Sequence, residues 1–295
     1  MKKPALESAG EIEKITRNLL LASKAWDKLP TPVDTIAQYA ELQIEMGMDL
    51  SKVEPGFFTK NFHFAKKALS KIVGLVDFRQ KKIYLDHTQS PSRKNFVKLH
   101  EVGHEALSWQ SSMKGFMDDD ETLDPLVDEL FEREASYFAS SSLFQLERFE
   151  DEAAKLPLSI KSAQLLGQKF GGSCHAAIRR YVERSPKRCA LLVLNKPEVN
   201  GEYTVGIRDY FQSPAFTASF GEVAWVNEKC GLDWVFVQEI KRGRKLHEDG
   251  RVALITGSGE SVTFNYHFFN STHNTFILLL PVGEKIKSRV VILQK

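Results

Sequence analysis

Two histidines near residue 100 have the type and spacing of metal ligands on a helix. The run His100-Glu101-Val102-Gly103-His104 separates the histidines by four residues. Residues four apart lie on one face of an α-helix, so both imidazole rings can bind one ion. Glu101 then lies beside that ion, with room for a water molecule between them. The pattern predicts a zinc site at His100 and His104.

The residues around the pentapeptide predict that both histidines point into the protein. Phe96, Val97 and Leu107 recur at helical spacing on the same stripe as His100 and His104. The alternative is a pair of ordinary buried histidines without a metal. A zinc site, unlike such a pair of histidines, needs a further ligand from elsewhere in the chain.

A catalytic zinc usually takes three protein ligands and leaves a fourth position for water. The predicted helix that contains Leu130–Ala139 offers Glu134, which has apolar residues one turn before it and one turn after it. A buried carboxylate is costly unless it binds a cation. Glu132 and Glu129 lie among other charged residues, as on a solvated helix face. We therefore predict Glu134 as the third ligand, in preference to Glu132 and Glu129.

Two other classes of enzyme with the H-E-x-x-H pattern are excluded by the neighbouring residues. The extended pattern with a third histidine requires a glycine and a histidine where this chain has Leu107 and Gln110. A deformylase-like site requires an upstream cysteine, and the first cysteine is Cys174.

The metal ligands are expected on two consecutive helices. Ser90-Pro91 is a typical helix start, and that helix should run to about Trp109. An acidic loop precedes a second helix from Pro125 to about Phe149. Further elements are expected upstream: helices at Gly10–Trp26, from Thr31-Pro32 and at Phe62–Leu69, and a hairpin of Ile72–Asp77 with Ile83–Asp86.

These motifs resemble the ImmA/IrrE family of metallo-endopeptidases. Its H-E-x-G-H helix corresponds to His100–His104, and its E-A-N-x-F-A signature corresponds to Glu134–Ala139, with Ser136 in place of asparagine. The leucine-leucine-methionine-proline run that often closes the second helix is replaced by Ser142–Gln145. The resemblance covers roughly residues 10–180.

The resemblance implies zinc bound by His100, His104 and Glu134, with Glu101 as the general base that passes a proton from water to the leaving amine. It also implies cleavage of a regulator, such as a helix-turn-helix repressor, in stress or mobile-element control. No spacing identifies the group that stabilises the oxyanion. Tyr137 is the candidate we name, and His87 and Arg93 also lie near the motif.

The expected fold class is α+β. We predict a mainly helical zincin-like metallopeptidase domain with a small sheet at residues 1–185, and a β-rich domain at 186–295 for sensing, substrate binding or oligomerisation. A plain hydrophobic core is the simplest explanation of its aromatic residues. Its strands are expected at Ala190–Leu194, Val235–Val237, Val252–Ile255, Phe276–Leu280 and Val290–Leu293.

The composition limits the other function classes. Forty basic residues against 38 acidic ones give a net charge of +2, which provides no strong field for nucleic acid or membrane. The basic run Lys241–Lys245 is interpreted as a hairpin turn. Three cysteines without a C-x-x-C pair argue against a disulfide framework, and no long apolar run is present, so we expect a cytoplasmic protein. The alternatives to an active zinc endopeptidase are a non-catalytic regulatory protein that keeps the metal-binding fold and a purely structural interaction protein.

Overall fold

The computed structural model describes residues 6–48, 74–77, 81–86, 88–110, 112, 124–200, 202–223, 225 and 229–284. The chain forms two compact units. The first contains Met1–Phe149 and Gln168–Ser173, and the second contains Glu150–Gly167 and Cys174–Lys295. This division by packing differs from the predicted domain boundary at 185/186, because residues before 186 also pack with the second unit. Within the described ranges, no helix is long and apolar enough to cross a membrane.

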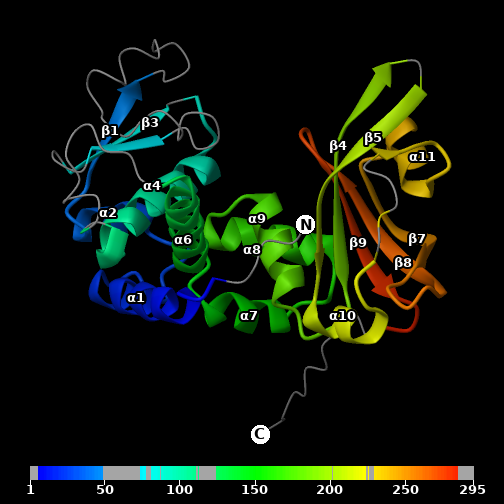
Figure 1. Cartoon of the computed structure of the whole chain (residues 1–295), viewed down its shortest axis with the longest axis horizontal. Coiled ribbons are helices and arrows are strands. Elements are labelled where there is room, and N and C mark those ends of the chain that lie inside the picture. Colours follow the sequence, from blue (N-terminus) through cyan, green and yellow to red (C-terminus); the bar gives the residue numbers. More distant parts are fainter. Residues whose placement is uncertain are drawn as a thin grey trace, which may run out of the picture. The chain divides into compact units, whose positions relative to one another are not determined.

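The first unit combines helices with a small sheet, as predicted (Figure 1). The strand order is β1-β3-β2, in which β1 runs parallel to β3, and β2 pairs antiparallel with β3. The predicted hairpin is therefore confirmed for its described residues. The predicted helix at 62–69 lies outside the described residues. The elements are α1 (Ala9–Ala22), α2 (Val33–Tyr39), β1 (Gln43–Met48), β2 (Gly74–Asp77), β3 (Lys82–Asp86), α4 (Pro91–Ala106) and α6 (Pro125–Leu143).

Helices α4 and α6 begin where their sequences predict. The Ser90 hydroxyl accepts a hydrogen bond from the backbone N–H of Arg93, and the Asp124 carboxylate accepts one from Leu126 N at 2.8 Å. Each cap satisfies a backbone N–H that the first helical turn leaves without a partner, and each is followed by proline at the first helical position. The two helices pack side by side (Figure 1).

Both of these helices end earlier than predicted. Helix α4 ends at Ala106 rather than near Trp109, because Leu107 adopts an extended conformation with φ −82° and ψ 92°. Helix α6 ends at Leu143 rather than at Phe149, because Gln145 has φ 50° and Leu146 has φ 52°. The buried amide of Gln145 stabilises this turn by donating to carbonyl and hydroxyl oxygens of the segment that joins α1 to α2.

The second unit is built on a six-stranded antiparallel sheet of order β6-β5-β4-β9-β8-β7. Its strands are β4 (Ala190–Asn200), β5 (Glu202–Gln212), β6 (Lys229–Cys230), β7 (Leu246–Ile255), β8 (Ser261–Asn270) and β9 (Thr275–Pro281). The remaining helices of the chain are α7 (Glu147–Ala154), α8 (Ile160–Phe170), α9 (Cys174–Glu183), α10 (Pro214–Phe220) and α11 (Val235–Lys241). The predicted strand at 290–293 lies outside the described residues.

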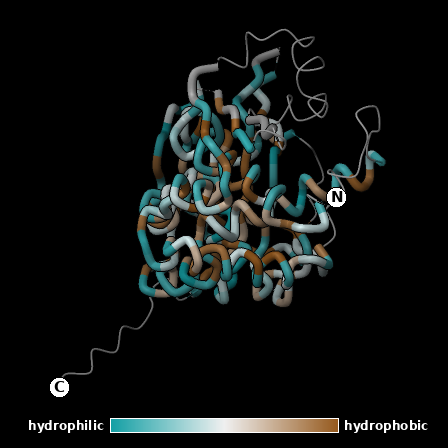
Figure 2. The backbone as a smooth tube through the Cα atoms, turned by 90° about the vertical axis from the view of Figure 1, so that its left-hand side faces the viewer, coloured by the Kyte–Doolittle hydropathy of each residue, from teal (hydrophilic) through white to brown (hydrophobic). Residues whose placement is uncertain are grey.

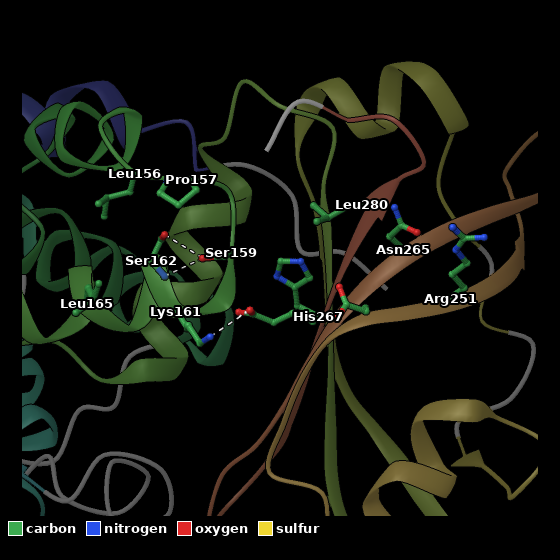
Figure 3. A pocket seen from close by; sticks show the side chains of 12 residues that line it. Leu156, Pro157, Ser159, Lys161, Ser162, Leu165, Arg251, Asn265, His267 and Leu280 are labelled. Atoms are coloured by element: carbon green, nitrogen blue, oxygen red, sulfur yellow. Dashed lines mark hydrogen bonds and ion pairs between the residues drawn. The ribbon is translucent and has the colours of Figure 1, made fainter. Parts of the chain in front are cut away.

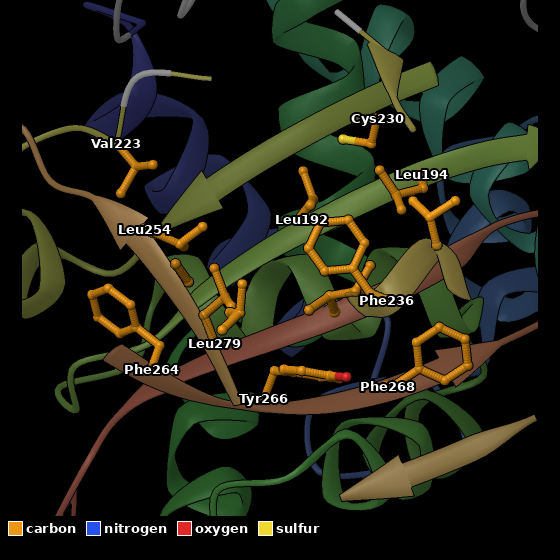
Figure 4. Packing of buried hydrophobic residues seen from close by; sticks show 14 of the residues in the cluster. Leu192, Leu194, Val223, Cys230, Phe236, Leu254, Phe264, Tyr266, Phe268 and Leu279 are labelled. Atoms are coloured by element: carbon orange, nitrogen blue, oxygen red, sulfur yellow. The ribbon is translucent and has the colours of Figure 1, made fainter. Parts of the chain in front are cut away.

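The central strands of this sheet are buried on both faces. Leu191 and Leu192 point to opposite faces, and both are fully buried. One face and helices α10 and α11 form what we call the sheet core, which includes Phe236 and Phe264 and draws residues from all six strands (Figure 4). On the opposite face, His175 of α9 packs edge-on against Phe276 with 5.6 Å between ring centroids. Hydrophobic and hydrophilic stretches alternate along most of the described chain (Figure 2).

The predicted strand at Val235–Val237 is wrong, because this segment begins α11. Phe236, Val237 and Ile240 are buried at helical spacing. A short apolar run does not distinguish a strand from a buried helix by periodicity alone. The basic run Lys241–Lys245 consequently follows a helix, and Gly243, with φ 71°, lies just after the C-cap residue Arg242. It is not a hairpin turn between two strands.

Candidate metal centre

The two histidines of α4 turn the same ring atom toward each other. His100 is 1% exposed and His104 is 3% exposed, and their Nε2 atoms are 3.1 Å apart. The rings meet edge-to-face, with 4.7 Å between centroids. The predicted placement of both side chains inside the protein is what the structure shows.

Glu132 of α6 completes a group of three possible ligands. Its Oε2 lies 3.2 Å from Nε2 of His100, and its Oε1 lies 3.2 Å from Nε2 of His104. Among the described residues, this is the group of at least three histidine, cysteine or acidic side chains that could hold a metal ion. The Glu132 side chain keeps 38% of its exposure, so one member of the buried group reaches the surface.

The separations between these donor atoms suit a small tetrahedral ion. Zinc ligands at about 2.0–2.2 Å from the metal lie about 3.3–3.6 Å from one another in a tetrahedron. The three observed separations of 3.1, 3.2 and 3.2 Å, the last two measured to different oxygens of Glu132, are close to that edge length. Two imidazoles and one carboxylate are also a donor set typical of catalytic zinc. The residues therefore fit the metal that the motif predicts.

Gly103 lets α6 approach α4 closely at the level of the histidines. A Cβ at this position would lie 3.1 Å from Cδ1 of Phe138, 3.2 Å from Cα of Ala135 and 3.3 Å from the Ala135 carbonyl oxygen. Such contacts are tighter than ordinary van der Waals separations, and two of them involve backbone atoms that cannot rotate away. The glycine of the motif thus permits the interhelical approach that brings Glu132 to the histidines.

Both histidines also contact a polar side chain through Nδ1. His104 Nδ1 lies 2.7 Å from Oε1 of Gln110, and His100 Nδ1 lies 3.3 Å from the hydroxyl of Ser136. Metal-binding histidines usually make such a contact, because it orients the ring and leaves the other nitrogen for the ion.

The electrostatics of the group favour an ionised Glu132. Burial opposes its ionisation, but the interactions with His100 and His104 outweigh that effect and hold the pKa of Glu132 far below its usual range. The carboxylate is therefore anionic at neutral pH, which is the state that binds a cation.

Glu134, which the sequence predicts as the third ligand, does not lie with the histidines. It is 4% exposed, and its Oε1 accepts a hydrogen bond from the Ser8 hydroxyl at 2.6 Å. Its Oε2 accepts from Trp109 Nε1 at 2.8 Å and from Gln110 Nε2 at 2.7 Å. The inward position was predicted correctly, but these three donors satisfy the buried carboxylate without a metal.

The other predicted site residues occupy different places. Glu101 is 5% exposed and follows His100 directly on α4, as the motif requires. The hydroxyl of Tyr137 donates to Glu13 of α1 at 2.5 Å. Burial lowers the pKa of Arg93. His87 lies outside the described residues.

With this geometry established, comparison with known proteins gives a consistent result. Residues 61–181 match the family model described as the IrrE N-terminal-like domain, peptidase M78. This match identifies an IrrE N-terminal-like domain in this part of the chain. A solved structure titled "Mycobacterium tuberculosis transcriptional regulator" resembles the chain with a TM-score of 0.53 and 13% identity, over 92% of this chain and 75% of that one. At this identity the likeness concerns the fold. No curated protein matches the sequence.

Sequence reasoning ranked Glu132 below Glu134 because it treated neighbouring charges as a sign of solvent. Glu132 lies one turn before Ser136, and Ser136 contacts His100, so this side of α6 faces α4. A usable signal was accessibility: a catalytic metal must remain reachable by water, which favours a carboxylate at the edge of the helix pair over one in the apolar stripe. Nothing in the spacing indicated the contact of Gln110.

The second unit contains a pocket of its own, with a volume of about 660 Å³, between α8 and strands β7, β8 and β9 (Figure 3). Burial lowers the pKa of His267 on its floor, which favours the neutral ring. Two cationic and two anionic side chains line it, and one cation, Lys161, forms an ion pair with Glu248. This mixture of charges favours no single class of ligand.

Proposed function

We propose that the protein is a zinc-dependent endopeptidase that hydrolyses a peptide bond in a cytoplasmic protein. The observation that carries this proposal is the convergence of His100 Nε2, His104 Nε2 and one Glu132 carboxylate within 3.1–3.2 Å of one another, next to the buried Glu101. The match of residues 61–181 to the IrrE N-terminal-like domain supports it.

In this proposal, His100, His104 and Glu132 would hold the zinc. The zinc would polarise the carbonyl of the substrate and lower the pKa of a water molecule. Glu132 replaces Glu134, because its oxygens face both histidines and those of Glu134 are occupied by three other donors. Glu101 accepts a proton from the attacking water and delivers it to the nitrogen of the departing amine.

The substrate that we propose is a protein regulator of transcription. The family resemblance and the similar fold of a protein titled a transcriptional regulator both support this choice. The same likeness supports a second candidate, in which the chain is a regulatory protein that binds the metal but does not hydrolyse peptides. The two candidates predict different peptide turnover but the same metal content.

The experiment that tests the metal centre is zinc stoichiometry, measured by elemental analysis of the purified full chain. The variants are Glu132→Ala and Glu134→Ala beside wild type. We expect one zinc per chain in wild type and loss of zinc in Glu132→Ala, because a direct ligand is removed. Glu134→Ala should bind more weakly but still reach one zinc per chain at saturating metal, because only a supporting carboxylate is removed.

The two variants give opposite results under the two ligand assignments. Loss of saturable binding in Glu134→Ala with retention in Glu132→Ala would restore the sequence-based choice of Glu134. No zinc in wild type after reconstitution would contradict the proposed function. Zinc at full stoichiometry, without cleavage of any member of a peptide library, would support the non-catalytic regulator.

A further inference from the structure

Gln110 is a fully buried side chain that connects the metal centre to Glu134. Its amide NH₂ donates to Oε2 of Glu134 at 2.7 Å and to the carbonyl oxygen of Phe131 at 3.2 Å. Both of these partners only accept, so the amide nitrogen must face them and Oε1 must face His104. Because Oε1 can only accept, the Nδ1 atom of His104, 2.7 Å away, carries the proton.

The bend at Leu107 is what lets Gln110 reach His104. On a continuous α-helix, a residue six positions later points about 120° away from His104. Here α4 ends at Ala106 and Leu107 is extended, and the backbone N–H of Gln110 then bonds to the Leu107 carbonyl at 2.8 Å. The shortened helix, which the sequence did not predict, thus has a structural consequence at the site.

Glu134 holds the Gln110 amide in this one orientation. The carboxylate is buried and also accepts from Ser8 and Trp109, so it is fixed from three sides. A flipped amide would place its oxygen against this anion and against the Phe131 carbonyl, which is unfavourable in a buried site. The negative charge of Glu134 thereby acts on His104 through Gln110.

Among the described residues, His100 has no equivalent buried amide partner. Its Nδ1 contact is the Ser136 hydroxyl at 3.3 Å, longer than the contact at His104. A hydroxyl can donate or accept and rotates to suit, so it does not select one protonated nitrogen. The two histidines of the centre are therefore held unequally.

We propose that Gln110 is a positioning residue that fixes His104 in the tautomer with the proton on Nδ1 and the lone pair of Nε2 directed at the metal position, and that Glu134 is its anchor. This inference rests on the proposed function for the identity of the metal, but the tautomer itself belongs to the metal-free chain. It gives Glu134 a role that requires its charge and burial without making it a ligand.

The test combines nitrogen NMR with zinc affinity on the full chain. Long-range ¹H–¹⁵N correlation spectra of the metal-free wild type should show His104 protonated at Nδ1. In Gln110→Met, which keeps the volume and removes the acceptor, this preference should be lost, and zinc should bind about 10–100-fold more weakly. Ser136→Ala should weaken zinc binding by a smaller factor.

Gln145→Met is the matched control. Gln145 is also fully buried in the first unit, and its amide makes hydrogen bonds to Lys28 and Thr31, distant in sequence from the metal motif. Both methionine variants should lower the unfolding temperature, whereas only Gln110→Met should change the His104 tautomer and the zinc affinity. That contrast separates positioning from a general loss of stability.

The outcomes for the two proposals are distinct. His104 without a proton on Nδ1 in the metal-free wild type overturns the role of Gln110, even if Gln110→Met does not fold. Zinc affinity within about twofold of wild type in a folded Gln110→Met chain also overturns it. Absence of zinc binding in wild type, with Nδ1 of His104 protonated and that preference lost in Gln110→Met, contradicts the proposed function and leaves the tautomer assignment supported.

Discussion

The two units of the molecule bury different kinds of side chain at their centres. Between α4 and α6, the buried residues include two histidines, two glutamates and a glutamine. In the sheet core of the second unit, the buried residues are almost all aliphatic or aromatic, and they include the fully buried Phe216, Phe236 and Phe264. Polar burial is costly unless each group has a partner, whereas apolar burial is favourable by itself.

This difference indicates that the interiors of the two units have different roles. The polar groups of the first unit satisfy one another in an ordered sequence from Glu134 through Gln110 to His104 and Glu132, which creates a place for a cation. The sheet core has no such sequence, so it is expected to contribute stability rather than chemistry. Variants of the two centres should therefore have opposite effects on function and on folding.

The largest effect on function is expected from Glu101→Gln. The amide keeps the shape of the side chain but cannot accept the proton of water, so turnover should fall about 10²–10⁴-fold. Zinc stoichiometry should stay at one per chain and the unfolding temperature close to that of wild type. Cleavage of a peptide library followed by mass spectrometry measures the first, and elemental analysis measures the second. Undiminished cleavage would remove Glu101 from the proposed mechanism.

The first unit shows which parts of a site a sequence can predict. His100, Glu101 and His104 are local in the chain, so helical periodicity alone placed them together. The carboxylate that joins the histidines depends on how α6 is rotated against α4, and that rotation is decided by contacts such as Gly103 with Ala135. The choice between Glu132 and Glu134 therefore depends on tertiary structure. The rule that charge faces solvent favoured Glu134, whereas the structure places Glu132 beside the histidines.

In the second unit, the sequence predicted strands well where a long run of residues is buried, and the prediction failed where only a short run is buried. β4 and β9 read as apolar runs because both of their faces are covered. The run at Val235–Val237 has the same texture but only three residues, and it folds as the start of α11. The backbone turns at Leu107 and Gln145 were also missed, since neither carries glycine or proline as a signal.

An intermediate effect, on stability alone, is expected from Phe264→Ala in the sheet core. Phe264 is fully buried, and its ring lies 5.3 Å from that of Phe216 and 5.2 Å from that of Phe220. Loss of the ring should lower the free energy of unfolding by about 3–5 kcal/mol. Ile255→Ala on the neighbouring strand, where the side chain is 53% exposed, should change it by about 0.5 kcal/mol or less.

The measurement for this pair is urea unfolding of the full chain, followed by zinc titration of whatever remains folded. Zinc affinity should be the same in wild type, Ile255→Ala and folded Phe264→Ala. A drop in zinc affinity in Phe264→Ala without any loss of stability would mean that the sheet core acts on the metal centre, which the comparison of the two units does not predict.

The smallest effect is expected from Gly103→Ala. Gly103 is a packing residue inside the metal centre, so its substitution should affect both stability and zinc binding. Its new methyl group would meet Phe138 at 3.1 Å and the Ala135 backbone at 3.2–3.3 Å, so α6 must move by a few tenths of an ångström. Overpacking of this kind costs about 1–3 kcal/mol. Because Glu132 moves with α6, zinc affinity should fall as well.

Gly10→Ala on α1, where a Cβ meets nothing within 4 Å, should instead raise stability by about 0.5–1 kcal/mol and leave zinc binding unchanged. Unchanged zinc affinity in a destabilised Gly103→Ala chain would mean that the centre tolerates displacement of α6, and the precise approach of the two helices would then matter for folding alone.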